Sequence, residues 1–131
     1  MADDGDKTGW QELREFADVD LARSYVLSWQ AIRDMLLIDI DLFLEPEHPF
    51  YEEPRPAEKV CIRPALIEFP YVDECRLDDA APQQVSELIK DLKTGAIEDL
   101  SVSGDGCYEI RGEFGTVFVH AERPILKLKG P

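Results

Sequence analysis

Two aspartates and a histidine near the middle of the chain have the types and spacing of possible metal ligands. Asp39 and Asp41 alternate with leucine and isoleucine, so on a β-strand both side chains lie on one face, with Cα atoms about 7 Å apart. His48 follows just past the end of this strand. Carboxylate oxygens with one imidazole can hold Mg²⁺, Mn²⁺ or Ca²⁺, so these three residues are a candidate site in a metal-binding protein or a metal-dependent enzyme.

A solvated strand face is the competing interpretation of the same residues. One side of an antiparallel sheet often faces water, and aspartates on that side need no ligand to explain them. The spacing of Asp39, Asp41 and His48 also matches no defined ligand motif. We therefore expect no metal and no other cofactor, and the metal site is kept as an alternative.

Other arrangements of catalytic residues are missing from the sequence. The only histidines are His48 and His120, and neither lies in a motif that connects it to a serine or cysteine nucleophile. The glycine-containing segments 104–106 and 112–115 have the composition of hairpin turns, and neither leads into a predicted helix as a phosphate-binding loop would. The sequence therefore predicts a protein that is not an enzyme.

Charge is the most unusual property of the chain. Its 131 residues include 28 acidic and 14 basic side chains, a net charge of −14. Such a field repels phosphate backbones and anionic lipid surfaces, and it attracts basic proteins. We therefore expect a basic protein partner, with no nucleic acid and no membrane among the partners.

The segment 45–56 is the part of the chain best suited to meet such a partner. Four of its twelve residues are prolines, which stiffen it and keep it out of the interior of a sheet. Carboxylates steer a basic partner and aromatic rings provide contact area, although Phe50 and Tyr51 could equally fold the loop onto its own domain. The candidate partner-binding residues, from this loop and the strand before it, are Asp39, Asp41, Glu45, Glu47, Phe50, Tyr51, Glu52 and Glu53.

Two helices are predicted from capping signals and periodicity. Thr8 and Gln11 have the spacing of a capping box, which predicts a short N-terminal helix at about 9–17. A clearer amphipathic helix is predicted at about 82–93, because it begins with a proline and its apolar residues recur at helical spacing. We expect this second helix to pack across a sheet.

Most of the remaining pattern predicts strands. Residues 36–44 send leucines and isoleucines to one face. Residues 24–32 are expected to pair with them in an antiparallel hairpin. In that hairpin Tyr25, Leu27 and Trp29 would all meet the apolar row.

Strands are also expected in the second half of the chain. Ile62 is expected to face inward, and Pro64 predicts a bulge, because the apolar residues change parity beyond it. The last third has the turn spacing of a four-stranded meander. The predicted fold class is therefore α+β: a mainly antiparallel β-sheet with one amphipathic helix packed on it and a short N-terminal helix.

Terminal composition and cysteine content indicate the organisation and the compartment. Residues 1–7 are polar and are expected to form a disordered tail before a single domain, residues 8–131. No signal peptide or membrane-spanning run is recognisable. The odd number of cysteines, without a Cys-x-x-Cys pair, is typical of free thiols in a reducing compartment. We expect a cytoplasmic protein with three free thiols, those of Cys61, Cys75 and Cys107.

These observations favour a small acidic cytoplasmic binding module that masks a basic protein surface, of the immunity-protein or inhibitor type, with no catalysis of its own. Its size and charge support this hypothesis, and no catalytic motif opposes it. One alternative is a divalent-metal-binding protein or metal-dependent enzyme that uses Asp39, Asp41 and His48. Another is a homo-oligomeric structural protein.

Overall fold

Antiparallel strands make up most of the regular structure. The computed structural model describes residues 7–53, 56 and 61–129. Within these residues the strands are β1 (Thr8–Gly9), β2 (Val19–Ile32), β3 (Met35–Leu44), β4 (Cys61–Phe69), β5 (Glu74–Leu77), β6 (Gly95–Val102), β7 (Cys107–Gly112), β8 (Gly115–His120) and β9 (Ile125–Leu128). Their order is β5-β8-β7-β6-β2-β3-β4-β9, with β1 beside β6. Every pairing is antiparallel, so the predicted antiparallel sheet is confirmed and the α+β class is wrong.

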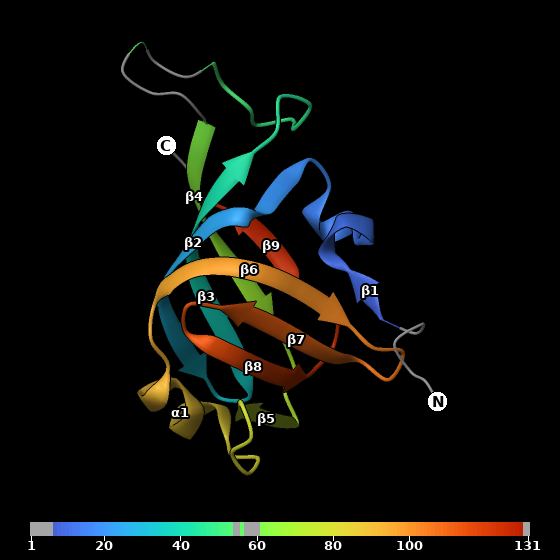
Figure 1. The fold of residues 1–131 in the computed structure, drawn as a ribbon, viewed down its shortest axis with the longest axis vertical. Coiled ribbons are helices and arrows are strands. Elements are labelled where there is room, and N and C mark those ends of the chain that lie inside the picture. Colours follow the sequence, from blue (N-terminus) through green and yellow to red (C-terminus); the bar gives the residue numbers. More distant parts are fainter. Residues whose placement is uncertain (1–6, 54–55, 57–60, 130–131) are drawn as a thin grey trace.

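β6 turns the sheet back over itself. Its first residues, Gly95 and Ala96, pair with β2, and from Ile97 onward it pairs with β7. Gly95 has a φ of +143°, and a Cβ there would lie 2.6 Å from the Glu113 carboxylate, so this turning point requires glycine. In Figure 1, β6, β7 and β8 cross in front of β2, β3 and β4. The largest fully buried side chains are Phe16, Phe69, Leu21, Leu36, Ile38, Ile40, Leu42, Leu44, Ile67, Leu88, Ile97 and Leu100.

β3 is the apolar strand that the sequence predicts. Its inward residues are each exposed by 1% or less: Leu36, Ile38, Ile40, Leu42 and Leu44. The alternate residues, which include Asp39 and Asp41, lie on the outer face of the layer formed by β2, β3 and β4. The predicted two-residue periodicity is therefore confirmed, and it places both aspartates on the same side.

β2 pairs with β3 as expected, but two irregularities change which residues face inward. Four residues of β2, 21–24, lie opposite the single residue Leu42, and Leu27 is inserted between the pairs that Val26 and Ser28 make with β3. Val26 and Trp29 are consequently both buried. Tyr25 and Leu27 are each 46% exposed, so only Trp29 of the three predicted inward residues meets the core.

The predicted helix at 82–93 is much shorter than expected. Gln83 extends the sheet instead, because its N–H donates to the Cys75 C=O (2.9 Å). The helix α1 covers Val85–Leu88, and a single 3₁₀ turn, Ile89–Asp91, follows. At its end the Lys93 C=O accepts a hydrogen bond from Trp29 Nε1 (2.7 Å), so backbone polar groups at both ends of the predicted helix are bound to the sheet. In the described residues no helix is long and apolar enough to span a membrane.

The predicted N-terminal helix at 9–17 is also wrong. Thr8 and Gly9 form β1 and pair with the end of β6. Two separate 3₁₀ turns follow, Trp10–Glu12 and Arg14–Phe16, and neither has a side-chain cap. Strand pairing of Thr8 and burial of Phe16 in the core therefore outweigh the helix-starting tendency of the capping-box pattern.

β4 carries its proline without a bulge. Its residues pair one to one with β3, and Pro64 lies opposite Asp41. The Pro64 C=O accepts a hydrogen bond from the Lys129 N–H (2.9 Å), so the missing donor of the proline points toward the β9 side and costs no bond to β3. Ile62 consequently lies on the outer face, 52% exposed, and its predicted inward orientation is wrong.

The last third of the chain forms a meander of three strands rather than four. β6, β7 and β8 pair in sequence, but β9 crosses to the far edge and pairs with β4. Of the predicted tail 1–7, residues 1–6 lie outside the described residues. Lys7 is described, and its ammonium pairs with the Glu109 carboxylate (3.0 Å).

Candidate functional site

Hydrogen bonds hold the first part of the predicted binding loop in place. The Glu45 N–H donates to the Asp18 C=O (2.9 Å), and the His48 N–H donates to the Glu45 C=O (3.0 Å). The Tyr51 N–H then donates to the His48 C=O (2.9 Å), and the Phe50 N–H donates to His48 Nδ1 (3.0 Å). Figure 1 shows this segment beyond the end of β3, away from α1. The backbone of this part of the loop is therefore held in a defined arrangement.

The two aromatic residues of the loop point to different surroundings. Tyr51 packs against the hydrophobic core. Phe50 is 62% exposed, and its ring centroid lies 5.9 Å from that of His48. Tyr51 therefore holds the loop to its own domain, and Phe50 remains accessible to solvent.

The loop carboxylates differ in the same way. Glu52 is paired with Arg63 of β4. In the part of the chain that the structure describes, Glu45, Glu47 and Glu53 make no side-chain hydrogen bond or ion pair. These three carboxylates are the ones available to a cation from outside the molecule.

The Asp39 carboxylate of the predicted site is bound by residues of its own chain. Its carboxylate accepts hydrogen bonds from Ser28 Oγ (2.8 Å) and Gln30 Nε2 (2.8 Å), and Lys129 pairs with it. Only 14% of the side chain is exposed. The Lys129 ammonium, helped by the Ser28 hydroxyl, lowers the pKa of Asp39. The charge of Asp39 is thus neutralised within its own chain.

Asp41 lies two residues further along the same face and has no such partners. It sits between Tyr25 of β2 and Pro64 of β4 in the pairing of the strands. Its side chain makes no hydrogen bond or ion pair among the described residues. Asp41 therefore remains with Glu45, Glu47, Phe50 and Glu53 as the accessible part of the predicted site.

The structure does not bring the three candidate metal ligands together. Across residues 7–53, 56 and 61–129, no group of three or more histidine, cysteine, aspartate or glutamate side chains is close enough to hold a metal ion. Asp39 is bound to Lys129, and His48 Nδ1 accepts the Phe50 N–H.

Comparison with known proteins adds no relative. No family model, curated protein or solved structure matches this chain. The candidate site is therefore characterised by the contacts within this chain alone.

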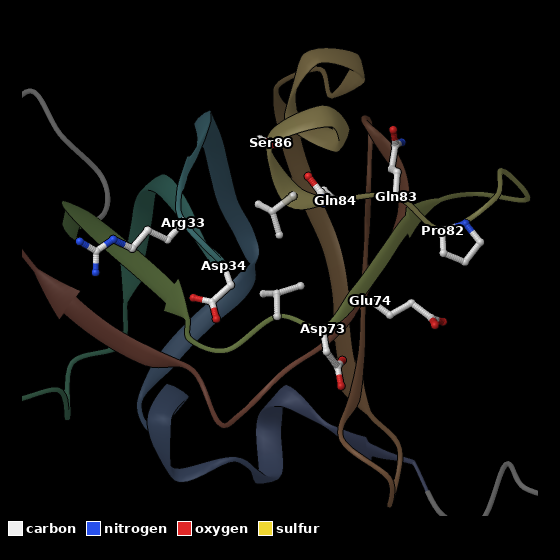
Figure 2. Close-up of a pocket in the computed structure, with 10 residues that line it drawn as sticks. Arg33, Asp34, Asp73, Glu74, Pro82, Gln83, Gln84 and Ser86 are labelled. Carbon is white, nitrogen blue, oxygen red and sulfur yellow. The ribbon is translucent and has the colours of Figure 1, made fainter.

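Another part of the described chain forms a hollow at the end of the molecule away from the loop. It has a volume of about 530 Å³ and is lined by the β2–β3 turn, the start of β5 and the segment before α1. Figure 2 shows the Arg33 and Glu74 side chains extending in opposite directions from it. These two charged groups therefore do not converge on one point, as catalytic groups acting on one substrate atom must.

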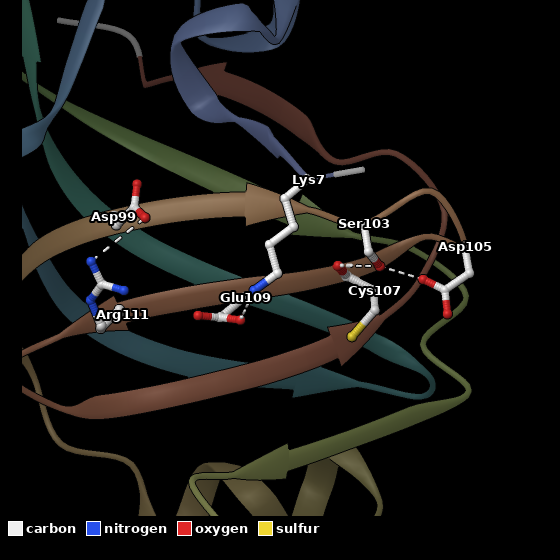
Figure 3. A network of polar contacts seen from close by, with 7 residues as sticks. All are labelled: Lys7, Asp99, Ser103, Asp105, Cys107, Glu109 and Arg111. Carbon is white, nitrogen blue, oxygen red and sulfur yellow. Dashed lines mark hydrogen bonds and ion pairs between the residues drawn. The ribbon is translucent and has the colours of Figure 1, made fainter. Parts of the chain in front are cut away.

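The outer face of β6 and β7 is also charged, but its carboxylates Glu98, Asp99 and Glu109 each lie in an ion pair. Figure 3 shows Lys7 reaching Glu109 across the strands, and Arg111 beside Asp99. The remaining contacts in this view join the Ser103 hydroxyl to the Asp105 carboxylate and to the Cys107 C=O (3.4 Å), in the turn between β6 and β7. This face therefore offers fewer unmatched carboxylates than the loop.

Sequence reasoning missed two residues of the accessible surface. Tyr25 and Ile62 were both predicted to face the core, and both lie outside, next to Asp41 and Phe43 respectively. The alternation of apolar residues in the sequence could not indicate that these two side chains lie outside. The register shifts in β2 change the face of Tyr25, and the absence of a bulge in β4 changes the face of Ile62. Asp18, whose C=O binds Glu45, was also missed because it precedes β2 in the sequence.

His120 lines a hollow of about 320 Å³ and connects the segment before β5 with the turn between β6 and β7. Its Nδ1 lies 2.6 Å from Asp73 Oδ1, and its Nε2 lies 2.7 Å from the Asp105 C=O. Both partners accept hydrogen bonds, so the ring satisfies both only when each nitrogen carries a proton. The Asp73 carboxylate, followed by the Asp105 carbonyl, raises the pKa of His120.

We expect the raised pKa of His120 to make stability depend on pH. Its contribution is fully present below the unfolded-state pKa of about 6.5 and is lost as the pH rises through the higher folded-state pKa. The effect on the free energy of unfolding should be below about 1 kcal/mol, because the side chain is partly exposed. A ring-proton NMR titration checks this: Asp73→Asn should lower the pKa of His120, and Asp79→Asn, which removes an exposed carboxylate outside this contact, should not.

Proposed function

We propose that this chain is a small acidic binding module that masks a basic surface of a partner protein, of the immunity-protein or inhibitor type, without catalysis of its own. The observation that carries the proposal is a set of accessible carboxylates at one end of the molecule, together with an exposed aromatic ring in the same loop. These residues are Asp41, Glu45, Glu47, Phe50 and Glu53.

The balance of charge at this end supports a basic partner. Described residues 18–25, 41–53 and 61–64 contain seven carboxylates and two guanidinium groups, a net charge of −5. Arg23 is paired with Asp20, and Arg63 with Glu52, so neither is available to neutralise the rest. Clustered carboxylates steer a cationic protein into contact and repel nucleic acid and anionic membranes. The cytoplasm remains the compartment that we propose for this encounter.

The arrangement of the loop supports specific contact rather than a diffuse acidic surface. Phe50 offers a large apolar area, and residues 45–51 are already held by backbone hydrogen bonds. A partner would therefore meet a preformed aromatic anchor in a loop that also carries accessible carboxylates. An anchor with a charged rim is a common arrangement of protein–protein interfaces.

A matched pair of triple variants tests the proposal. Glu45→Gln, Glu47→Gln and Glu53→Gln together remove three accessible loop charges. Glu74→Gln, Asp79→Asn and Asp91→Asn remove three exposed charges from the other end, where β5 and α1 lie (Figure 1). Both variants have the same net charge, so a difference between them reports position.

The measurement is capture of proteins from the native host's lysate, identification by mass spectrometry and titration of the purified partner. We expect the wild type and the control variant to bind the same basic protein, and the loop variant to bind it about tenfold more weakly at low salt. Binding should weaken between about 0.05 M and about 0.5 M NaCl. A partner without positive charge, or equal affinity of both triple variants, contradicts the proposal.

A further inference from the structure

Apolar side chains gather on the outer face of β2, β3 and β4, beside the loop. Tyr25 and Ile62 are 46% and 52% exposed, and Pro64 is exposed as well. In the strand register Tyr25 lies next to Asp41, and Asp41 lies next to Pro64. Phe43, two residues along β3, lies next to Ile62. We call these five residues the outer patch.

The outer patch contains one carboxylate that lacks the partners of its neighbour. Asp39, on the same face of β3, is bound by Ser28, Gln30 and Lys129. Asp41 occupies the next outward position among apolar residues, and in the described residues no donor reaches it. A partly buried carboxylate without donors favours a cation supplied by another molecule.

The outer patch is continuous with the acidic loop. A hollow of about 310 Å³ lies between them, lined by Phe43 and Asp20 on the strand side and by Glu45 and Tyr51 on the loop side. The Arg23 guanidinium lies 5.2 Å from the centre of the Phe43 ring and pairs with Asp20. One bound segment could therefore contact the patch and the loop together.

We propose that the outer patch docks a segment of the basic partner in which an apolar side chain lies beside an arginine. This inference rests on the proposed function. A guanidinium can bind both oxygens of Asp41 while its plane stacks on the Tyr25 ring. The apolar side chain then covers Ile62 and Pro64, which would otherwise remain in water.

A second copy of this chain is a poorer occupant of the outer patch. The surface around it carries the net charge of −5 described above, and a symmetric dimer would bring two such surfaces into contact. Like charges placed opposite each other disfavour association. Positive charge on the occupant removes this repulsion.

Two synthetic peptides of equal length and charge test the inference. One alternates arginine with leucine and the other alternates arginine with serine, and both are titrated into the wild-type protein by calorimetry and amide NMR. We expect the arginine–leucine peptide to bind at least about tenfold more tightly. It should shift the amides of Tyr25, Asp41, Phe43 and Ile62 as well as those of the loop.

Single variants with matched controls locate the effect. Asp41→Asn and Ile62→Ser should each remove most of the preference for the arginine–leucine peptide. Asp34→Asn and Ile125→Ser change an exposed aspartate and an exposed isoleucine elsewhere, and they should preserve the preference. The NMR shifts on the wild-type protein give an independent reading if a variant folds poorly.

The possible failures are distinguishable. Equal affinity of the two peptides, with shifts confined to loop 45–53, overturns the outer patch and leaves the proposed function standing. Absence of binding by both peptides at low salt contradicts both proposals. Shifts of the outer-patch amides that depend on protein concentration, without peptide, show that a second copy covers the patch and overturn this inference.

Discussion

The substitution Trp29→Ala is expected to lower the free energy of unfolding by about 3–5 kcal/mol, the cost typical of removing a large aromatic side chain from a core. Trp29 is 9% exposed and packs edge-on against Phe114, with ring centroids 5.0 Å apart. Its Nε1 also donates to the Lys93 C=O (2.7 Å), which fixes the chain just before β6. The variant therefore loses apolar burial and a bond between two segments, and urea denaturation measures the sum.

Leu27→Ala is the matched control for this prediction. Regular alternation would place Leu27 and Trp29 on the same face, but the insertion at Leu27 leaves its side chain 46% exposed. We expect Leu27→Ala to lower the free energy of unfolding by less than about 1 kcal/mol. Similar losses in the two variants would mean that β2 alternates regularly, contrary to the structure.

The parts of the fold that could be predicted from sequence are those determined by neighbouring residues. β3 has an apolar residue at every second position from Leu36 to Leu44 and two aspartates between them, and a strand is the element in which that period separates two faces. The turn between β6 and β7 was also expected, because Gly104, Asp105 and Gly106 favour a tight reversal. Neither expectation depends on a distant segment.

The failures occur where distant segments decide the local structure. Residues 82–93 have an amphipathic helical pattern. Gln83 nevertheless pairs with Cys75, so the helix begins only after it, and beyond the helix the Lys93 C=O is bound by Trp29. Thr8 likewise pairs with β6 instead of capping a helix. No local pattern reveals these partners, so tertiary contacts overrode propensity at both helices.

In the candidate site, too, some features follow from the local sequence and others depend on distant residues. Its position at the end of β3 follows from the order of residues, and the loop proline content indicated an element outside the sheet. Which carboxylates are accessible could not be predicted, because Asp39 and Asp41 have the same local pattern. Lys129, ninety positions away, pairs with one of them and leaves the other.

The substitution Ser24→Ala is expected to lower the free energy of unfolding by about 2 kcal/mol, although it removes a single oxygen atom. Ser24 is 1% exposed and lies in the wide irregularity between β2 and β3. Its Oγ donates to the Asp20 C=O (3.0 Å) and accepts from the Phe43 N–H (3.0 Å). The hydroxyl thus replaces backbone pairing that the irregularity interrupts, and alanine leaves a donor and an acceptor without this partner.

Ser101→Ala is the control, since Ser101 lies in β6 and its hydroxyl makes no hydrogen bond among the described residues. It should change the free energy of unfolding by less than about 0.5 kcal/mol in the same denaturation experiment. Equal stability of the two variants would show that the Ser24 hydroxyl does not bridge the strands. Because Phe43 belongs to the outer patch and Asp20 borders it, loosening this bridge should also weaken binding of the arginine–leucine peptide, whereas Ser101→Ala should leave that binding unchanged.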